Sequence, residues 1–192
     1  MIDFSNKASI ERLVKSCVNG DRISQKELFQ TFYGKMLGVC MRYTGNKTEA
    51  QDVVHDAFIK VFLSLSKFEN KGSLEGWIRR IMVNSAIDHV RKKREMFLSG
   101  DESKIEALED DVNEQFEIEI YTKIKADLVM KCVQQLSPAY RTVFNMYIVE
   151  NYSHQEIAEI LNISVGASKS NLAKAKMRVQ ELFKLHSHEI EE

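Results

Sequence analysis

The sequence predicts an all-α chain in which two small helical domains are joined by an acidic linker. Glycine and proline are scarce, with 8 and 1 residues among 192, whereas strong helix formers such as Leu, Glu, Lys and Ala dominate. Apolar residues recur at the three- and four-residue spacing of amphipathic helices on both sides of one weakly periodic stretch. The charge distribution divides the chain in the same places.

Charge is unevenly spread along the chain, although the formal net charge is only −1. Residues 1–94 contain 17 Lys and Arg against 10 Asp and Glu, and residues 95–119 contain one Lys against 10 acids. Residues 120–192 contain 9 basic and 8 acidic residues. Two basic or neutral segments therefore flank an acidic one, and such asymmetry indicates a polyanionic partner.

The N-terminal domain, residues 1–95, is expected to be a helical bundle. Apolar pairs repeat every four positions over residues 28–41, which predicts one long helix. Thr48 and Gln51 fit a capping box and predict the start of a second helix, whose apolar stripe covers residues 53–65.

A third helix of this bundle is expected to begin near Leu74, after a polar break over residues 69–73. Residues 10–18 are a candidate fourth helix. Matching stripes and short turns predict a compact bundle. The acidic stretch that follows, residues 96–120, has weak periodicity and is predicted to be a linker.

The C-terminal domain, residues 121–192, is predicted to contain four helices. The first ends before Ser137 and Pro138, which fit the N-cap and first position of the next helix. That helix is expected to bury Tyr140, Val143, Phe144 and Tyr147.

The last two helices have the pattern of a helix-turn-helix. Ser153 and Glu156 form a capping box that predicts a short helix, and Asn162, which tolerates left-handed geometry, predicts its end. Ser164 then caps a final helix whose N-terminal residues would approach base edges while its basic side chains meet phosphate. A solvated basic face on an ordinary helical hairpin is the alternative.

The third helix of the N-terminal domain is a second candidate DNA-binding element. Arg80, Asn84 and Arg91 lie along one face at helical spacing, where they could neutralise phosphates and hydrogen-bond a base. Trp77 could stack on an unpaired base or pack in the core. The preceding loop, residues 68–73, could hold a flipped base or simply connect two helices.

Catalysis and metal binding are not expected. The sequence has no Gly-rich phosphate loop, no H-E-x-x-H motif and no nucleophile paired with a histidine by a local motif, so no enzyme activity, cofactor or metal is predicted. Cys17, Cys40 and Cys132 are far apart and predict reduced, buried helix residues. The absence of a secretory signal and of an apolar run of roughly 20 residues predicts a cytoplasmic protein.

Several of these segments together resemble the extracytoplasmic-function sigma factors, a group of the sigma-70 family of bacterial RNA polymerase. The resemblance covers nearly the whole chain, in order and at the expected spacing. The segments that carry it are residues 52–62, residues 77–94 with their core at 84–88, Leu136-Ser-Pro with Arg141, Ser153-x-x-Glu156-Ile-Ala, and Ser164-Val-Gly166.

The resemblance implies a sigma domain 2-like bundle and a sigma domain 4-like helix-turn-helix that bind core RNA polymerase and direct promoter-specific initiation. It assigns docking on the polymerase clamp helices to Asp52, His55, Asp56 and Lys60. It assigns single-strand reading of the minus-10 element to Phe68, Asn70, Lys71, Arg79, Arg80, Asn84, Arg91 and Lys92. It assigns duplex reading of the minus-35 element to Gly166, Ser168, Lys169, Asn171, Lys174, Lys176 and Arg178.

Further partners implied by the resemblance are the polymerase flap and an anti-sigma factor. The chain would be associated with the nucleoid when bound to polymerase, and an anti-sigma factor could hold it at the membrane. Family members usually have Gln in place of His55, and docking should survive this change because imidazole also hydrogen-bonds. They often have a hydrophobic residue at Ser168 and Arg at Asn171, and these departures bear on promoter preference. The alternative function is an autonomous helix-turn-helix regulator that binds duplex DNA without polymerase.

Overall fold

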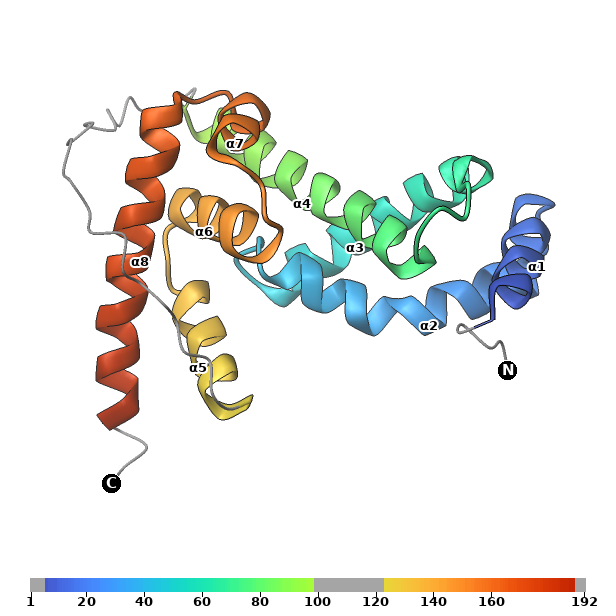
Figure 1. The fold of residues 1–192 in the computed structure, drawn as a ribbon, viewed down its shortest axis with the longest axis horizontal. Coiled ribbons are helices and arrows are strands. Elements are labelled where there is room, and N and C mark those ends of the chain that lie inside the picture. Colours follow the sequence, from blue (N-terminus) through green and yellow to red (C-terminus); the bar gives the residue numbers. More distant parts are fainter. Residues whose placement is uncertain (1–5, 99–122, 189–192) are drawn as a thin grey trace. The chain divides into compact units, whose positions relative to one another are not determined.

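The computed structural model describes residues 6–98 and 123–188, and these residues form helices with no β-strand among them (Figure 1). The predicted all-α fold is therefore confirmed. The chain divides into two compact units, Met1–His89 and Val90–Glu192, and the division falls inside one long helix. Most of the segment expected to be a linker lies outside the described residues, and the long helix continues into its first residues, to Leu98.

The N-terminal unit is a helical bundle. Leu28, Phe58 and Ile78, from three of the predicted stripes, are at most 2% exposed. Burying a side chain of this size contributes about 1.5–3 kcal/mol, so the stripes account for much of the packing energy. The elements are α1 (Lys7–Val18), α2 (Arg22–Met41), α3 (Lys47–Ser64), the 3-10 turn η1 (Leu65–Lys67) and most of α4 (Leu74–Leu98).

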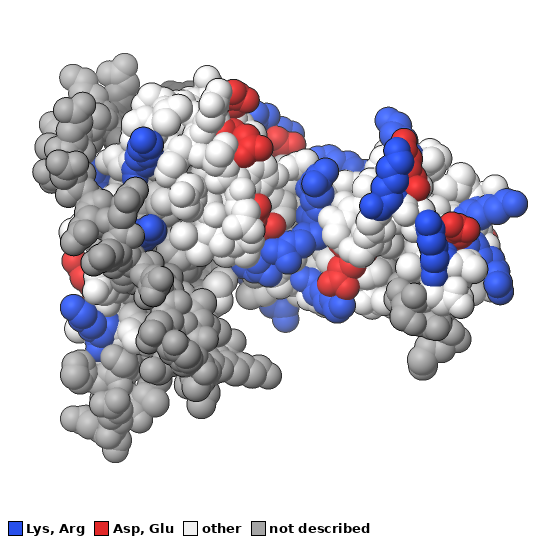
Figure 2. All heavy atoms as spheres, viewed as in Figure 1, with Lys and Arg blue, Asp and Glu red and all other residues white. Residues whose placement is uncertain are grey.

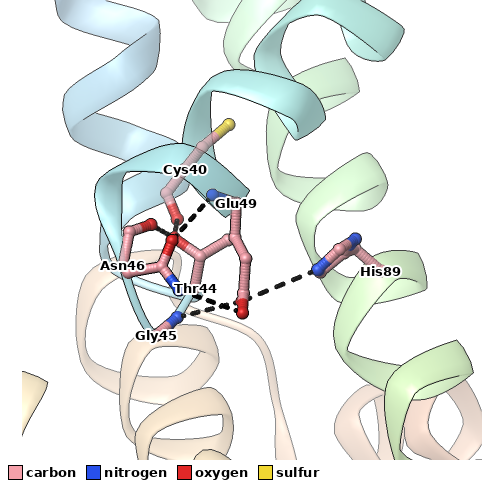
Figure 3. A network of polar contacts seen from close by, with 6 residues as sticks. All are labelled: Cys40, Thr44, Gly45, Asn46, Glu49 and His89. Atoms are coloured by element: carbon pink, nitrogen blue, oxygen red, sulfur yellow. Dashed lines mark hydrogen bonds and ion pairs between the residues drawn. The ribbon is translucent and has the colours of Figure 1, made fainter.

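The start of α3 differs from the predicted capping box of Thr48 and Gln51, which was wrong. Asn46 is the N-cap, because its side-chain oxygen accepts the Glu49 backbone N–H at 2.9 Å. The Glu49 carboxylate accepts in return from the Asn46 side-chain amide at 3.1 Å and from the Gly45 N–H at 3.4 Å (Figure 3). Asn is as good an N-cap as Ser or Asp, so the helix begins two residues earlier than expected.

The Glu49 carboxylate also connects this turn to α4. Its Oε2 lies 3.8 Å from Nε2 of His89 (Figure 3). On the other side of the turn, the Thr44 hydroxyl lies 3.2 Å from the backbone oxygen of Cys40, at the end of α2. The network therefore joins the α2–α3 turn to the helix that carries the candidate minus-10 residues.

The C-terminal unit confirms most of the predicted helix signals. The Ser137 hydroxyl caps its helix, and Ser153 and Glu156 form the reciprocal capping box. Asn162 ends its helix with a φ of 52°, and the Ser164 hydroxyl accepts the Ala167 N–H at 2.9 Å. The elements are α5 (Lys123–Gln134), α6 (Pro138–Phe144), the π-helical turn η2 (Asn145–Val149), α7 (His154–Leu161) and α8 (Val165–His188).

The helix after Ser137 buries fewer residues than expected. Val143 and Phe144 are buried, but Tyr140 is half-buried and Tyr147 is 36% exposed. At Tyr147 the physical reason is the change from α to π geometry in η2, which widens the turn and alters the face on which this side chain lies. The Tyr147 ring instead stacks on His154, with the ring centroids 4.5 Å apart.

The three cysteines are free and buried in helices, as predicted. Burial raises the pKa of the Cys40 thiol to about 12, so it stays protonated and unreactive. In residues 6–98 and 123–188, no cluster of three or more His, Cys, Asp or Glu could hold a metal ion. Within the same residues, no helix has the length and apolar character needed to cross a membrane.

Candidate nucleic-acid interface

One face of α4 is basic and exposed. Arg80, Asn84, Arg91 and Lys92 are exposed, whereas Arg79 is half-buried. Arg80, Asn84 and Arg91 share one face of the helix by their spacing, and Arg91 and Lys92 lie beyond His89, the last residue of the N-terminal unit. On the face of the molecule shown in Figure 2, Lys and Arg side chains gather over the N-terminal unit, interspersed with Asp and Glu.

The loop before α4 is held by contacts on both sides. The Phe68 ring packs on Trp77 with centroids 5.7 Å apart and an interplanar angle of 58°. Trp77 is half-buried, so its ring is partly packed and partly accessible. Asn70 has a left-handed φ of 56°, which Asn adopts more readily than most residues, and its side-chain amide donates to Glu11 Oε1 at 2.7 Å. Helix α1 therefore helps to fix the shape of this loop.

A hollow of about 230 Å³ lies between α1, η1 and this loop. Val14, Val18 and Leu65 supply apolar lining, and Phe68 and Asn70 line it from the loop. An apolar recess with an aromatic ring and an amide is chemically suited to an unpaired nucleobase.

Sequence reasoning missed the part that α1 plays in this site. Glu11 and Asn70 are separated by 59 positions, so no local pattern connects them. The third loop residue expected to contact DNA, Lys71, is exposed and pairs with Glu69 at 2.5 Å.

One exposed face of α3 carries the residues expected to contact the polymerase. Asp52, His55 and Asp56 are exposed there. Ile59 and Leu63 continue the same face at helical spacing and are 59% and 78% exposed. Large apolar side chains grouped on an exposed helix face indicate a protein contact. Sequence reasoning missed both residues, although their spacing from Asp52 and Asp56 was visible in the sequence.

Two of the expected docking residues lie at the edges of this face. Lys60 turns toward α4, where its Nζ donates to Ser85 Oγ at 3.0 Å and lies 3.9 Å from Asp88 Oδ2. The His55 ring lies against α2, nearly parallel to the ring of Phe29 at a centroid distance of 6.2 Å. Lys60 and His55 therefore help to pack α3 within the bundle, and the middle of the face belongs to the acidic and apolar residues.

The beginning of α8 presents a small exposed surface. Gly166 and Lys169 are exposed, and Val165 is 42% exposed at the first helical position. Sequence reasoning included Val165 only within the Ser164-Val-Gly166 segment, yet an apolar side chain there could contact a thymine methyl group. The remaining expected basic residues are the half-buried Lys174 and Lys176 and the exposed Arg178, which pairs with Glu181 at 2.8 Å.

Ser168 and Asn171 were expected to contact bases, and the structure corrects both assignments. Ser168 is 0% exposed and Asn171 is 6% exposed. They belong to the buried stripe of α8, together with Leu172, Ala175 and Val179. Side chains so deeply buried cannot reach a base edge while the domain stays folded.

The Ser168 hydroxyl is instead hydrogen-bonded to His154, with 2.9 Å between Oγ and Nδ1. The imidazole ring of His154 also stacks on the ring of Tyr147. Burial, and then the positive charges of Lys169 and Lys176, lower the pKa of His154. The neutral imidazole is therefore the favoured form in the folded domain.

Acidification is expected to destabilise the C-terminal domain through His154. Because the pKa of His154 lies below its ordinary value of 6.5 in the folded domain, the unfolded chain takes up the proton first. The stabilising contribution is complete above pH 6.5 and is lost as the pH falls through the folded-state pKa. Thermal unfolding of the full chain should therefore lose less Tm on acidification in His154→Phe than in the wild type. Equal losses would contradict this assignment.

Both units match known families. The family model of sigma-70 region 2 matches residues 28–96, and that of sigma-70 region 4 matches residues 126–179. Together these matches cover more than half of the chain. The first contains α3, the loop and most of α4, and the second contains the helix-turn-helix. Helix α1 lies outside both matches.

Curated relatives agree with the family models. The ECF RNA polymerase sigma factor SigW of Bacillus subtilis is 28% identical over 183 residues, which are 87% of this chain and 92% of that protein. The ECF RNA polymerase sigma factor SigE of Mycolicibacterium smegmatis is 29% identical over 171 residues, 86% of this chain and 64% of that protein. A solved structure of the sigma factor RpoE of Bartonella quintana, in complex with the anti-sigma factor NepR, is 21% identical, with a TM-score of 0.46 and coverage of 83% and 96%. From its two matched regions and these ECF relatives, the chain belongs to the sigma-70 family as an extracytoplasmic-function sigma factor, a DNA-binding transcription initiation factor and not an enzyme.

Proposed function

We propose that the chain binds core RNA polymerase and directs initiation at promoters whose minus-10 element it reads as single strand and whose minus-35 element it reads as duplex. The observation that supports this division is that the region 2 match and the region 4 match each contain an exposed basic helix, and that different elements precede these two helices. Helix α8 is the second helix of a helix-turn-helix, which suits the major groove of a duplex. Helix α4 follows a loop with an aromatic pair and a hollow, which suits unpaired bases.

In the proposed minus-10 site, Arg80, Arg91 and Lys92 neutralise phosphates along α4. Asn84 lies between the two arginines on the exposed face, and its amide can both donate to and accept from a base edge. The hollow beside Phe68 and Asn70 would hold a base that has left the stack. Strand opening is then favoured because the unpaired strand has contacts that the duplex lacks.

The proposed docking surface for core polymerase is the exposed face of α3. Asp52 and Asp56 at one end would steer the encounter with a basic helical partner. Ile59 and Leu63 at the other end would be buried on binding. A partner that covered this face would keep the chain from polymerase, which is the action that the family implies for an anti-sigma factor.

Reconstitution with core RNA polymerase tests the proposal. A promoter is first selected from a genomic library by transcription with the chain and core enzyme together. Permanganate, which oxidises unpaired thymines, should then modify the minus-10 region only when both the chain and core polymerase are present. An autonomous regulator would bind its duplex equally well without core enzyme. If the minus-10 region stays closed when the chain and core polymerase are both present, the proposed single-strand reading of the minus-10 element is rejected.

Replacing Asn84 with Ala should impair opening in the same assay. A base contact is worth about 1–3 kcal/mol, so permanganate reactivity should fall by about 5- to 150-fold, while footprinting of the minus-35 region stays unchanged. Gln30→Ala, an exposed amide on α2 of the same unit, is the matched control and should open the promoter normally. Equal opening by Asn84→Ala and the wild type would exclude a base contact by Asn84.

A further inference from the structure

Three elements of the C-terminal unit meet at His154. The residue is the first of α7, directly after the N-cap Ser153. Its ring stacks on Tyr147 of η2, with centroids 4.5 Å apart and an interplanar angle of 23°. Its Nδ1 lies 2.9 Å from the hydroxyl of Ser168, which is fully buried on α8 one residue before the exposed Lys169.

We infer that His154 is a positioning residue that sets the rotation of the recognition helix α8 about its own axis through the buried hydroxyl of Ser168. The inference rests on the proposed function of the C-terminal unit as a duplex reader. It assigns to His154 an effect on which bases are preferred, without any contact between His154 and DNA.

Apolar contacts and hydrogen bonds differ in how strongly they fix the orientation of a helix. Apart from Ser168 and Asn171, the buried side chains of α8 near this point, such as Leu172 and Ala175, are apolar, and apolar contact is non-directional, so it permits small rotations of the helix. A hydrogen bond has a defined distance and angle, and a buried hydroxyl without a partner is unfavourable. The rotation of α8 at which the Ser168 hydroxyl faces His154 is therefore lower in free energy than slightly different rotations of the helix.

The consequence for DNA follows from helix geometry. Successive residues of an α-helix point about 100° apart, because 3.6 residues complete one turn. Fixing the direction of Ser168 toward α7 therefore also fixes the direction in which Lys169 leaves the helix. Gly166 and Val165, less than one turn earlier, are fixed in the same way. These three residues form the exposed surface at the helix start.

The stack and the hydrogen bond can be separated by substitution. His154→Phe keeps a ring against Tyr147 and removes the nitrogen. His154→Asn removes the ring and places an amide nitrogen near the position of Nδ1. Ser168→Ala removes the hydroxyl with little change in volume. The matched control is His186→Phe, because His186 also lies on α8 and its Nε2 is 3.0 Å from the side-chain nitrogen of Gln135, in the turn that follows α5.

The experiment uses holoenzyme reconstituted from the full chain and core polymerase. The selected promoter competes for the holoenzyme with the same promoter carrying a scrambled minus-35 element. The ratio of the two affinities is measured across a range of salt concentrations. His154→Phe and Ser168→Ala should each lower this ratio by about tenfold, as expected for misaligned base contacts, with the salt dependence unchanged because phosphate contacts persist. The double variant should be no worse than either single one, and His154→Asn should recover most of the ratio.

An unchanged ratio in both His154→Phe and Ser168→Ala would overturn the inference. So would an equal loss in His186→Phe, since that would indicate general destabilisation of the unit. Circular dichroism of each variant verifies folding, and Ser168→Ala keeps the test decisive if His154→Phe is unstable. If the wild-type holoenzyme itself does not discriminate against the scrambled element, the proposed duplex-reading function fails before the inference about His154 is reached.

Discussion

Replacing Lys169, Lys174 and Lys176 together with Ala is expected to weaken holoenzyme binding to the minus-35 duplex by about 10- to 100-fold at physiological salt. Each Lys that contacts a phosphate releases a condensed counterion, so the slope of log affinity against log salt should become shallower by about 1 for each such Lys. Because the loss is electrostatic and independent of sequence, it should be similar for the selected promoter and for one with a scrambled minus-35 element. Titration at several salt concentrations measures both quantities.

A second substitution separates charge from packing. Lys174 and Lys176 are half-buried, so their aliphatic stems also cover apolar surface, and Ala removes that contact as well as the charge. The corresponding triple Gln variant keeps most of each stem and should reproduce the shallower slope. Lys131→Ala, an exposed Lys on α5, should leave the slope unchanged. If the triple variants keep the wild-type slope, these residues do not contact phosphate.

The parts of this protein that sequence reasoning predicted well are those with a local chemical cause. The capping box of Ser153 and Glu156 and the left-handed Asn162 each depend on residues within a few positions. The exposed face of Arg80, Asn84 and Arg91 follows from helical spacing alone. In each case the signal and the structure that it causes lie within one or two turns of helix.

The errors have identifiable physical causes. Ser168 and Asn171 were assigned to DNA because they lie near the N-terminal end of the predicted recognition helix, although their spacing with Leu172 and Ala175 is that of a buried stripe. The burial of Ser168 becomes understandable only with its partner, His154, fourteen positions away on another helix. The bond between Glu11 and Asn70 connects two regions that only the tertiary fold brings together. Long-range polar partners of this kind leave no periodic trace in one sequence.

Leu63→Asp is expected to lower the affinity for core RNA polymerase by about 30-fold or more, since truncating an apolar side chain that anchors an interface removes at least about 2 kcal/mol. A charge at this position would have to be desolvated against an apolar partner surface, which adds to the lost contact. Binding of the chain to core enzyme in the absence of DNA measures the effect directly. Ile59→Asp, one turn earlier on the same face, should have a similar result.

Ile23→Asp is the matched control for this substitution, because Ile23 is 78% exposed, as Leu63 is, and lies on α2 of the same unit. Neither change introduces a charge into the core, so both variants should unfold at the wild-type Tm. Equal losses of affinity in the two variants would indicate a nonspecific effect, and no loss for Leu63→Asp would exclude this face as the docking surface.

The two ends of the α3 face should also differ in kinetics. Neutralising Asp52 and Asp56 with Asn should slow association, mainly at low salt, because exposed charges act on the diffusional encounter. Leu63→Asp should instead accelerate dissociation at every salt concentration, because it removes contacts that form only in the bound complex. A salt-dependent association effect at one end and a salt-independent dissociation effect at the other would distinguish a steered, apolar docking face from an acidic surface that is merely solvated.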